Sequence, residues 1–471
     1  MRSPSKWGAV WLAGALGACT TVGPNFHSPA APAESGYAMV GDATTPLAAP
    51  GEASRDWWRS LGSSGLDRLM AEALAGNQTL ARADANLKAA RFAERAVAGG
   101  LEPQVDANAS LARERINTQA FGITGFPSPT LSLYTVGGSV SYDLDLFGGG
   151  RRRLEEARAQ LEASSERAGA AWIALTGQTA LAAVQIATIE NRLAAVSQII
   201  ADDKTNLDLI ARAQKAGAEA PSASNVGQAQ LAADEAMLPP LDQALAKQRH
   251  ALALLVGRPP GGWTAPQFTL ADFTIPGRIP VSVPSELVEN RPDIRAAEAE
   301  VHAATAAVGV AEAARYPDIR LTASIAQEAL SPAKLFSFAS TAYSLGPSLT
   351  APIFHGGALK ADQRQAQAAA RAAVDDWRQT VLSAFVQVAD VLSSLGEDQA
   401  QLKALESAEA VGASALKDAR TAYRLGGGTL LDVVTQERRL AQTRLQLADA
   451  EGARLGDVVQ LYAATAARWR P

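Results

Sequence analysis

The chain has 471 residues, of which 47% are hydrophobic and only 6% aromatic, and its net charge is −5. This acidic balance argues against nucleic-acid binding, which needs a basic face, and four histidines with one cysteine are too few for the common zinc sites. Much of the hydrophobic fraction is alanine, which favours long, closely packed helices over several compact domains.

The N-terminus has the features of a secretory signal peptide over residues 1–18. Basic residues precede an apolar run that ends at Leu16 and is too short to span a bilayer as a mature helix. The residues before Cys19 resemble the lipobox of bacterial lipoproteins, so acyl chains on Cys19 would anchor the protein to a membrane. An ordinary signal peptide followed by a chance cysteine is the alternative. Residues 19–56 are rich in Pro, Ala, Gly and Ser, which predicts a lipid-anchored, extended segment.

An internal duplication organises the rest of the chain. Residues 103–114 reappear as 317–328, with the proline, an Ala-Ser pair and the glutamate retained, at an offset of 317 − 103 = 214. Residues 146–150 then match 353–357 at an offset of 353 − 146 = 207, and a third match follows at 424 − 215 = 209. Matches in the same order at nearly one offset indicate two copies of one unit.

We therefore predict two structural repeats, over 57–262 and 284–469, joined by a linker over 263–283. Each repeat has the pattern helix, strand, loop, strand, very long helix, turn and helix. The predicted strands lie at about 105–115, 133–144, 318–328 and 342–353. Apolar and polar residues alternate along all four, as in membrane β-barrel strands with one face toward lipid and the other toward a lumen. A half-buried soluble sheet has the same alternation, but four such strands behind a lipoprotein signal favour the membrane.

Two long stretches lack proline, from about 150 to 213 and from about 356 to 425. Nearly 70 helical residues at ~1.5 Å each would form a rod of roughly 100 Å. In the second stretch, apolar residues recur at the spacings of a coiled-coil seam. They are Val374, Trp377, Val381, Val388, Val391, Leu395 and Leu402. Helices this long do not fit inside one compact domain, and so we expect a tube or a bundle.

Four strands are too few to close a membrane barrel, because the smallest barrels have about eight. Open sheet edges are not tolerated in hydrocarbon. If the strands cross a membrane, several copies of the chain must therefore associate, and two, three or four copies satisfy this argument. The long helices would continue the barrel as a second cylinder around the same axis, which would make the assembly a conduit.

The chain resembles the TolC-type outer membrane efflux proteins, particularly the lipoprotein branch that serves RND-type pumps. The most specific segment is 283–298, VPSELVENRPDIRAAE, although Asn290 stands where arginine is usual; residues 56–58 and 253–260 are also similar. The resemblance implies an α+β membrane protein that forms a homotrimer. Its 3 × 4 = 12 strands would form one outer-membrane β-barrel, continued through the periplasm by a long α-helical coiled-coil barrel. It also implies contact with outer-membrane lipid, a periplasmic adaptor (membrane fusion) protein and an inner-membrane RND-type pump, and no cofactor.

In this family the turns between long helices form the periplasmic tip of the channel. By the resemblance, an apolar residue, glycines and a threonine of the second turn contact the adaptor, together with a glycine of the first turn. These positions are Leu425, Gly426, Gly427, Thr429 and Gly217. A flexible glycine-rich turn that ends a helix would explain the same residues without a partner.

The resemblance also indicates a periplasmic gate. Asp432 aligns with an aspartate that in relatives faces the channel axis and forms an acidic ring, which would favour cations. Leu431 and Arg438 align with gate-region positions, whereas Thr435 replaces a further acid of some members, so we expect a constriction that is less acidic or more easily opened. In the first turn Asn225 replaces the acid. A solvated surface aspartate is the other explanation of Asp432.

The leading hypothesis is a passive exit duct that serves an efflux pump for drugs or other small compounds. A type I secretion duct for polypeptides is one alternative. A coiled-coil envelope lipoprotein without a pore is another, and it predicts no ion conductance. The sequence contains no nucleophile elbow and no paired metal-ligand spacing, and so we do not expect an enzyme.

Overall fold

The computed structural model describes residues 21–30, 36–39, 42, 48–51, 53–122, 125, 127–217 and 220–465. Contacts divide the chain into two compact units. The first is drawn from Met1–Pro29, Leu87–Ser164 and Ala297–Trp377, and the second from Ala30–Asn86, Ser165–Ala296 and Arg378–Pro471. Each unit thus takes residues from both repeats. The duplicated halves are not compact by themselves, because their strands join one sheet and their helices pack together.

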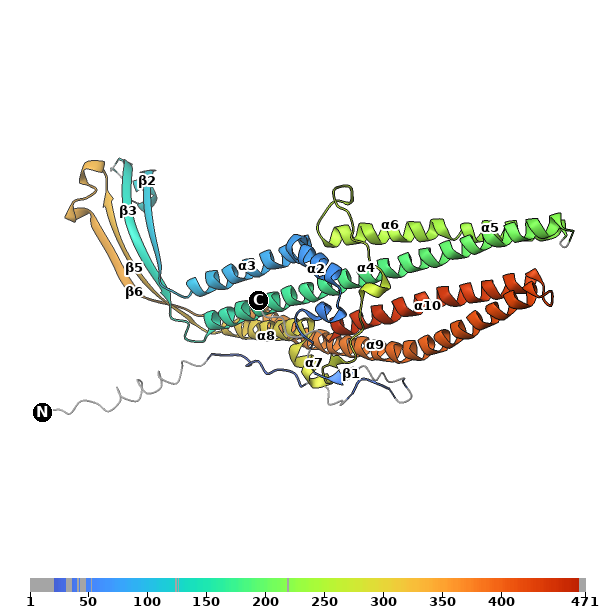
Figure 1. Cartoon of the computed structure of the whole chain (residues 1–471). Helices are drawn as coiled ribbons and strands as arrows, with labels where there is room; N and C mark the ends of the chain where they lie inside the picture. Colours follow the sequence, from blue (N-terminus) through green and yellow to red (C-terminus); the bar gives the residue numbers. More distant parts are fainter. Residues whose placement is uncertain are drawn as a thin grey trace. The chain divides into compact units, whose positions relative to one another are not determined.

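A four-stranded antiparallel sheet with the order β2-β3-β5-β6 forms part of the first unit (Figure 1). Its strands are β2 (Gln104–Arg115), β3 (Thr130–Asp143), β5 (Asp318–Ala329) and β6 (Thr341–Thr350). Short 3-10 turns lie in the two hairpins: η2 (Thr118–Phe121), η5 (Pro332–Lys334) and η6 (Phe338–Ser340). β3 begins before the expected residue 133, because Thr130 pairs with Arg115 at the end of β2. β6 ends at Thr350 rather than at 353, because Pro352 has no N–H for a ladder hydrogen bond.

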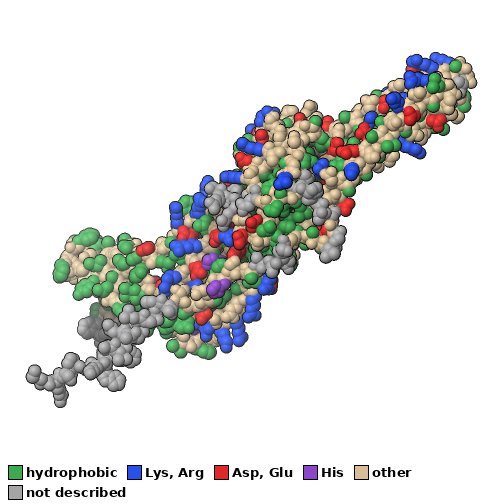
Figure 2. All heavy atoms as spheres, turned by 60° about the horizontal axis from the view of Figure 1, so that its bottom comes forward, with side chains coloured by type: hydrophobic (Ala, Val, Ile, Leu, Met, Phe, Trp, Pro, Cys, Tyr) green, Lys and Arg blue, Asp and Glu red, His purple; other side chains and the backbone are tan. Residues whose placement is uncertain are grey.

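The register of the sheet places residues of one kind in rows. Directly opposed residues on neighbouring strands share a face. One row is apolar, Val105–Val140–Ala323–Leu345, and the adjacent row is polar, Asp106–Ser139–Ser324–Ser344. The alternation within each strand therefore becomes an alternation between the two faces of the whole sheet. Many apolar side chains are exposed: Val105, Leu111, Leu133, Val136, Val140, Tyr142, Leu321, Ile325, Tyr343, Leu345 and Leu349. In the view of Figure 2, hydrophobic side chains (green) gather over the visible face of the sheet.

Two helices of equal length dominate the rest of the chain. α4 (Gly149–Lys215) and α9 (Ala358–Arg424) each have 67 residues, close to the two proline-free stretches. The predicted seam of α9 is buried at Val381, Val388 and Leu395, among others. Part of α4 is long and apolar enough to cross a membrane by composition alone, but 61% of that part is buried inside the protein. We therefore interpret it as a core helix.

Shorter helices precede and follow the long ones. α2 (Ser64–Gly76) and α3 (Gln78–Gly99) lead into β2, as α7 (Pro284–Asn290) and α8 (Pro292–Ala313) lead into β5. After α4 the chain returns through α5 (Pro221–Glu235) and α6 (Leu238–Leu255), whereas after α9 it returns through the single helix α10 (Leu430–Ala464). The break between α5 and α6 falls where two consecutive prolines, Pro239 and Pro240, can occupy only a first helical turn.

The second unit has an aromatic core that fixes its N-terminal residues. Trp57, in the short helix η1 (Trp57–Leu61), is 1% exposed and stacks on Tyr462 of α10 with ring centroids 5.2 Å apart. Trp58 packs against Trp172 of α4 at 5.7 Å. Further short elements complete the unit: β1 (Ala48–Pro50) pairs with β4 (Ile279–Val281) in parallel, and η3 (Pro260–Gly262) and η4 (Leu270–Asp272) lie in the connecting segment.

Candidate functional site

The residues predicted for the tip and the gate lie at one end of the two helical hairpins in the second unit. Gly217 is in the α4–α5 turn, Leu425 to Thr429 form the α9–α10 turn, and Leu431 to Arg438 lie on the first turns of α10. Cys19, the predicted lipidation site, lies outside the described residues.

The α9–α10 turn is a Schellman motif. Gly426 adopts φ +75°, its N–H donates to the carbonyl of Tyr423 at 3.1 Å, and the N–H of Gly427 donates to the carbonyl of Ala422 at 2.9 Å. α4 ends at a second left-handed glycine: Gly217 has φ +76°, and its N–H donates to the Gln214 carbonyl at 2.9 Å. Leu425 is 82% exposed at the apex. The turn thus presents an apolar side chain and glycine backbone on a rigid base.

A capping box begins α10 immediately after this turn. The Asp432 carboxylate accepts hydrogen bonds from the Thr429 N–H at 2.9 Å and from the Thr429 hydroxyl at 2.6 Å. The Asp432 N–H donates to the Thr429 hydroxyl oxygen at 3.2 Å. The hydrogen bonds from Thr429 lower the pKa of the exposed Asp432 carboxyl below its ordinary value. Asp432 is therefore an ionised surface carboxylate that also fixes the start of the helix.

The other gate candidates point to the α4–α5 hairpin. Arg438 donates from Nη2 to Asp234 Oδ2 at 2.9 Å, which joins α10 to α5. Leu431, Thr435 and Arg438 line a cavity of about 390 Å³ together with residues of α4 and α5, among them Asp203. The three residues are thus brought together, whereas the Asp432 side chain turns back to Thr429.

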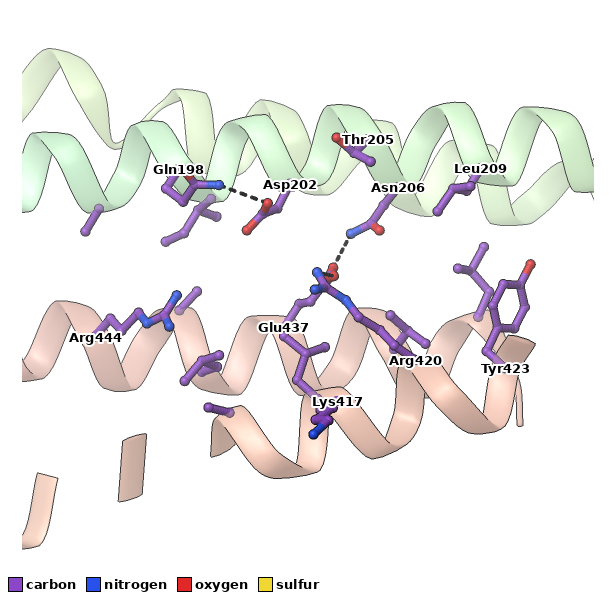
Figure 3. Close-up of a pocket in the computed structure, with 18 of the residues that line it drawn as sticks. Gln198, Asp202, Thr205, Asn206, Leu209, Lys417, Arg420, Tyr423, Glu437 and Arg444 are labelled. Carbon is purple, nitrogen blue, oxygen red and sulfur yellow. Dashed lines mark hydrogen bonds and ion pairs between the residues drawn. The ribbon is translucent and has the colours of Figure 1, made fainter. Parts of the chain in front are cut away.

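A second bridge joins the two hairpins through a buried carboxylate (Figure 3). The side chain of Glu437 is 9% exposed; it accepts from Asn206 Nδ2 of α4 and from Arg420 Nη2 of α9, both at 2.5 Å. These residues line a groove of about 850 Å³ between α4 and the α9–α10 hairpin. Its floor is the apolar cluster Leu416, Val433 and Leu440.

Carboxylates outnumber arginines at these bridges. Asp203 and Asp234 are each 8% exposed, and they lie together beside Arg438 and Glu437. Burial is the largest cause that raises the pKa of Asp203 to about 6, and its hydrogen bond with Asp234 adds to this effect. Asp203 therefore takes up a proton as the pH falls through about this value.

Sequence reasoning identified Arg438 but missed its partner Asp234, and it missed Asp203, Asn206 and Glu437 entirely. No local pattern marks these residues. Arg438 and Asp234 are 204 positions apart along the chain, and Asn206 and Glu437 are 231 apart. On a long helix, the position of an acidic residue in the sequence does not show whether its side chain is buried or faces solvent. Among the described residues, no group of three or more His, Cys, Asp or Glu is placed to hold a metal ion.

Comparisons with known proteins agree on one family. The sequence profile of the outer membrane efflux proteins matches residues 69–258 and 283–467. Outer membrane protein OprJ of Pseudomonas aeruginosa is 31% identical over 100% of this chain and 97% of its own length. The pyoverdine export outer membrane protein OpmQ of the same species is 29% identical over 97% of this chain and 96% of its own. The solved outer-membrane channel OprN superposes with a TM-score of 0.88 at 28% identity, covering 96% of this chain and all of that one.

Proposed function

The chain belongs to the outer membrane efflux protein family, and from this premise we propose that three copies of it form one passive exit duct through the outer membrane and across the periplasm. The protein is the outer membrane component of an efflux pump, as its relatives are. Its fold is the helix-rich α+β fold of the TolC-like channels. The proposal adds the number of copies, the closed barrel, the anchor and the contacts of the tip.

One observation carries the proposal: the sheet has an apolar face, a polar face and two free edges. β2 and β6 are the outer strands of the sheet and pair with no other strand of the described chain. In lipid the exposed backbone groups of these edges need partners. Pairing of β6 in one copy with β2 in the next satisfies both edges. Three copies then close a barrel of 12 strands, with the apolar rows toward lipid and the polar rows toward the lumen.

The helices extend this duct without any need for catalysis. α4 and α9, at 67 residues each, are roughly 100 Å long at ~1.5 Å per residue, which exceeds the thickness of a bilayer several-fold. Packed laterally in a ring, they form a tunnel in the periplasm. An inner-membrane pump of the RND type supplies the energy, and the duct supplies the passage for drugs or other small compounds.

The tip is the proposed contact for a periplasmic adaptor protein. Leu425 is exposed at the apex, and Gly426 and Gly427 leave the backbone beside it uncovered. Thr429 fixes the turn to α10, and Gly217 ends the other hairpin with the same left-handed conformation. The exposed Leu425 side chain, next to uncovered glycine backbone, is an apolar surface that an adaptor protein can contact.

The gate is proposed to lie next to this contact, on the first turns of α10. Leu431 is 69% exposed and Asp432 is an exposed, ionised carboxylate, so three copies would place three of each around the axis. Three converging carboxylates favour cations. Arg438 joins α10 to α5 through Asp234, and Thr435 lines the same cavity. Lipid chains on Cys19, outside the described residues, would anchor each copy to the outer membrane.

Conductance in planar bilayers tests the duct. We expect discrete channel steps from the purified protein and preference for cations over anions. Asp432→Asn keeps an oxygen that can cap α10 but removes the charge, so we expect lower cation selectivity with an unchanged fold. Asp432→Ala removes both. Protein that inserts but never conducts would contradict the duct, and selectivity unchanged in Asp432→Asn would contradict the acidic ring alone.

A further inference from the structure

The N-terminal segment of the described chain is seated in a socket of the first unit. We define the strap as Thr21–Ser28. The N–H of Val22 donates to the carbonyl of Phe147, which follows β3, at 3.1 Å. Ser28 donates to Glu298 of α8 at 2.5 Å. The strap is thus held at both ends.

A buried arginine forms the centre of the socket. The side chain of Arg152, in the first turn of α4, is 3% exposed. It donates from Nε to the Val22 carbonyl at 3.1 Å and from Nη2 to the Gly23 carbonyl at 3.2 Å and Asn25 Oδ1 at 2.9 Å. Its remaining Nη1 forms an ion pair with Glu155 at 2.7 Å. Three of its four hydrogen bonds therefore go to the strap, and without the strap this cation would keep only its ion pair with Glu155.

An aromatic stack forms the second half of the socket. Phe26 lies flat on His302 of α8, with ring centroids 4.3 Å apart and an angle of 13° between the rings. His302 Nε2 is 3.0 Å from Glu155 Oε1, so the carboxylate that pairs with Arg152 also orients the imidazole. One network thus holds the strap by its backbone and by its aromatic side chain.

Three glycines allow the strap to pack closely against the first unit. A Cβ on Gly309 of α8 would lie 2.8 Å from the Arg152 side chain, and a Cβ on Gly23 would lie 2.5 Å from the Gly309 Cα. A Cβ on Gly148 would lie 2.9 Å from the Thr21 Cα. The strap therefore packs backbone to backbone against α8 and against the turn between β3 and α4.

From this geometry we infer that Arg152 and His302 are positioning residues that fix the lipid anchor where the strands leave the membrane. The inference rests on the proposed acylation of Cys19. Thr21 packs against Gly148. Two residues span at most about 7 Å, so the covalent reach from Thr21 limits how far from Gly148 an acyl group on Cys19 could be attached. The socket thus determines how deep in the membrane the anchor lies. The acyl chains on Cys19 are the anchor that the socket positions.

Chymotrypsin cleavage after Phe26 reports whether the strap is seated. We use the full-length channel in detergent, follow release of the N-terminal peptide by mass spectrometry, and measure palmitate incorporation separately. Gly309→Ala favours helix formation in α8 but displaces Arg152, so we expect a folded channel whose cleavage after Phe26 is roughly tenfold faster or more. Arg152→Ala should have the same effect. Cleavage after Tyr37, which donates to the Ser282 carbonyl and lies outside the strap, is the internal reference.

The matched controls are Arg153→Ala, which removes the exposed neighbour of Arg152, and Gly99→Ala, whose new Cβ meets nothing within 4 Å. Both should behave as the wild type. Equal cleavage in Gly309→Ala and in the wild type, or equal acceleration in Arg153→Ala, would overturn the socket. Wild type that is protected at Phe26 but takes up no palmitate would instead refute the proposed acylation, and with it the positioning of an anchor.

Discussion

Three consecutive glycines follow α9, but only the first has a backbone conformation that requires glycine. Gly426 has φ +75°, whereas Gly427 and Gly428 do not have positive φ values. We expect Gly426→Ala to destabilise the turn by about 1–2 kcal/mol, because a Cβ is disfavoured in the left-handed region. Gly427→Ala is the control, since its Cβ would approach only the Ala422 carbonyl oxygen, at 3.8 Å. Hydrogen exchange at the start of α10 measures the difference.

The same pair of variants separates the fold of the tip from its proposed binding role. If Gly427→Ala leaves hydrogen exchange unchanged but weakens cross-linking to an adaptor, the glycine serves the contact. If both variants accelerate exchange equally, the assignment of the strain to Gly426 is wrong.

The buried aspartate pair gives the tip a dependence on pH. The pKa of Asp203 is raised to about 6, chiefly by burial and then by Asp234, so the folded state binds a proton more tightly than the unfolded chain does. A raised carboxyl pKa contributes stability that is complete below the ordinary value of 3.8 and is lost as the pH rises through about 6. We expect Asp203→Asn, which mimics the protonated acid, to raise the unfolding temperature most near pH ~8, and to raise it progressively less as the pH falls toward the ordinary value of 3.8.

A neighbouring substitution controls for loss of surface charge. Asp202, which accepts from Gln198 and is less buried than Asp203, gives the control Asp202→Asn. A second acid also titrates in this range, since burial and Asp398 raise the pKa of Asp457 to about 6. Some pH dependence should therefore remain in Asp203→Asn. An identical pH profile in Asp203→Asn and the wild type would contradict the assignment.

At the scale of elements, α4 and α10 approach closely at one glycine. A Cβ on Gly452 would lie 2.2 Å from the Thr188 hydroxyl and within 2.9 Å of its Cβ, and a short β-branched side chain cannot swing away. We expect Gly452→Ala to destabilise the protein by about 1–3 kcal/mol through overpacking. One turn later, a Cβ on Gly456 would make an ordinary contact at 3.5 Å with Leu181. Gly456→Ala should stabilise α10 by up to about 1 kcal/mol. Thermal unfolding of the two variants should therefore shift in opposite directions, and a shift in the same direction would refute the close approach.

Most elements could be predicted from the sequence because their signals are local. Alternation marks the strands, the absence of proline marks α4 and α9, and Pro292 marks the start of α8. The break between α5 and α6 was missed, although Pro239 and Pro240 mark it in the sequence. The prediction treated the two repeats as equivalent, and prolines that only one repeat carries were overlooked.

The candidate site was predictable only in part, because its interactions are not local. The turn that ends α9 at Gly426 was predicted, because glycines in a turn are a local signal. The cap that Thr429 and Asp432 form is equally local, but it was not predicted. The ion pair between Arg438 and Asp234 depends on how α10 and α5 pack against each other. That packing cannot be predicted from a single sequence.

At the scale of the whole molecule, the two faces of the sheet predict opposite responses to charge. Leu345 lies in an apolar row and Ser344, its neighbour, in a polar row. We expect Leu345→Arg to destabilise the membrane-inserted assembly by about 2–4 kcal/mol, because a cation would face hydrocarbon. Ser344→Arg, which would face the lumen, should cost little stability and alter conductance. The recovery of heat-resistant oligomers in detergent measures the first effect, and single-channel current measures the second. Loss of oligomers in Ser344→Arg but not in Leu345→Arg would reverse the proposed orientation of the sheet.

The unequal return paths of the two hairpins have a mechanical consequence. α10 is one continuous helix of 35 residues, roughly 50 Å long at ~1.5 Å per residue. It begins after Thr429 and carries, near its other end, Tyr462, which stacks on Trp57. The return from the α4–α5 turn is interrupted, because α5 and α6 are separate helices. We therefore expect a force on the α9–α10 turn to be transmitted along the continuous helix α10 to the stacked rings of Trp57 and Tyr462. A force on the α4–α5 turn would instead bend the chain at the break between α5 and α6. A partner that grips both turns with equal force would displace them unequally.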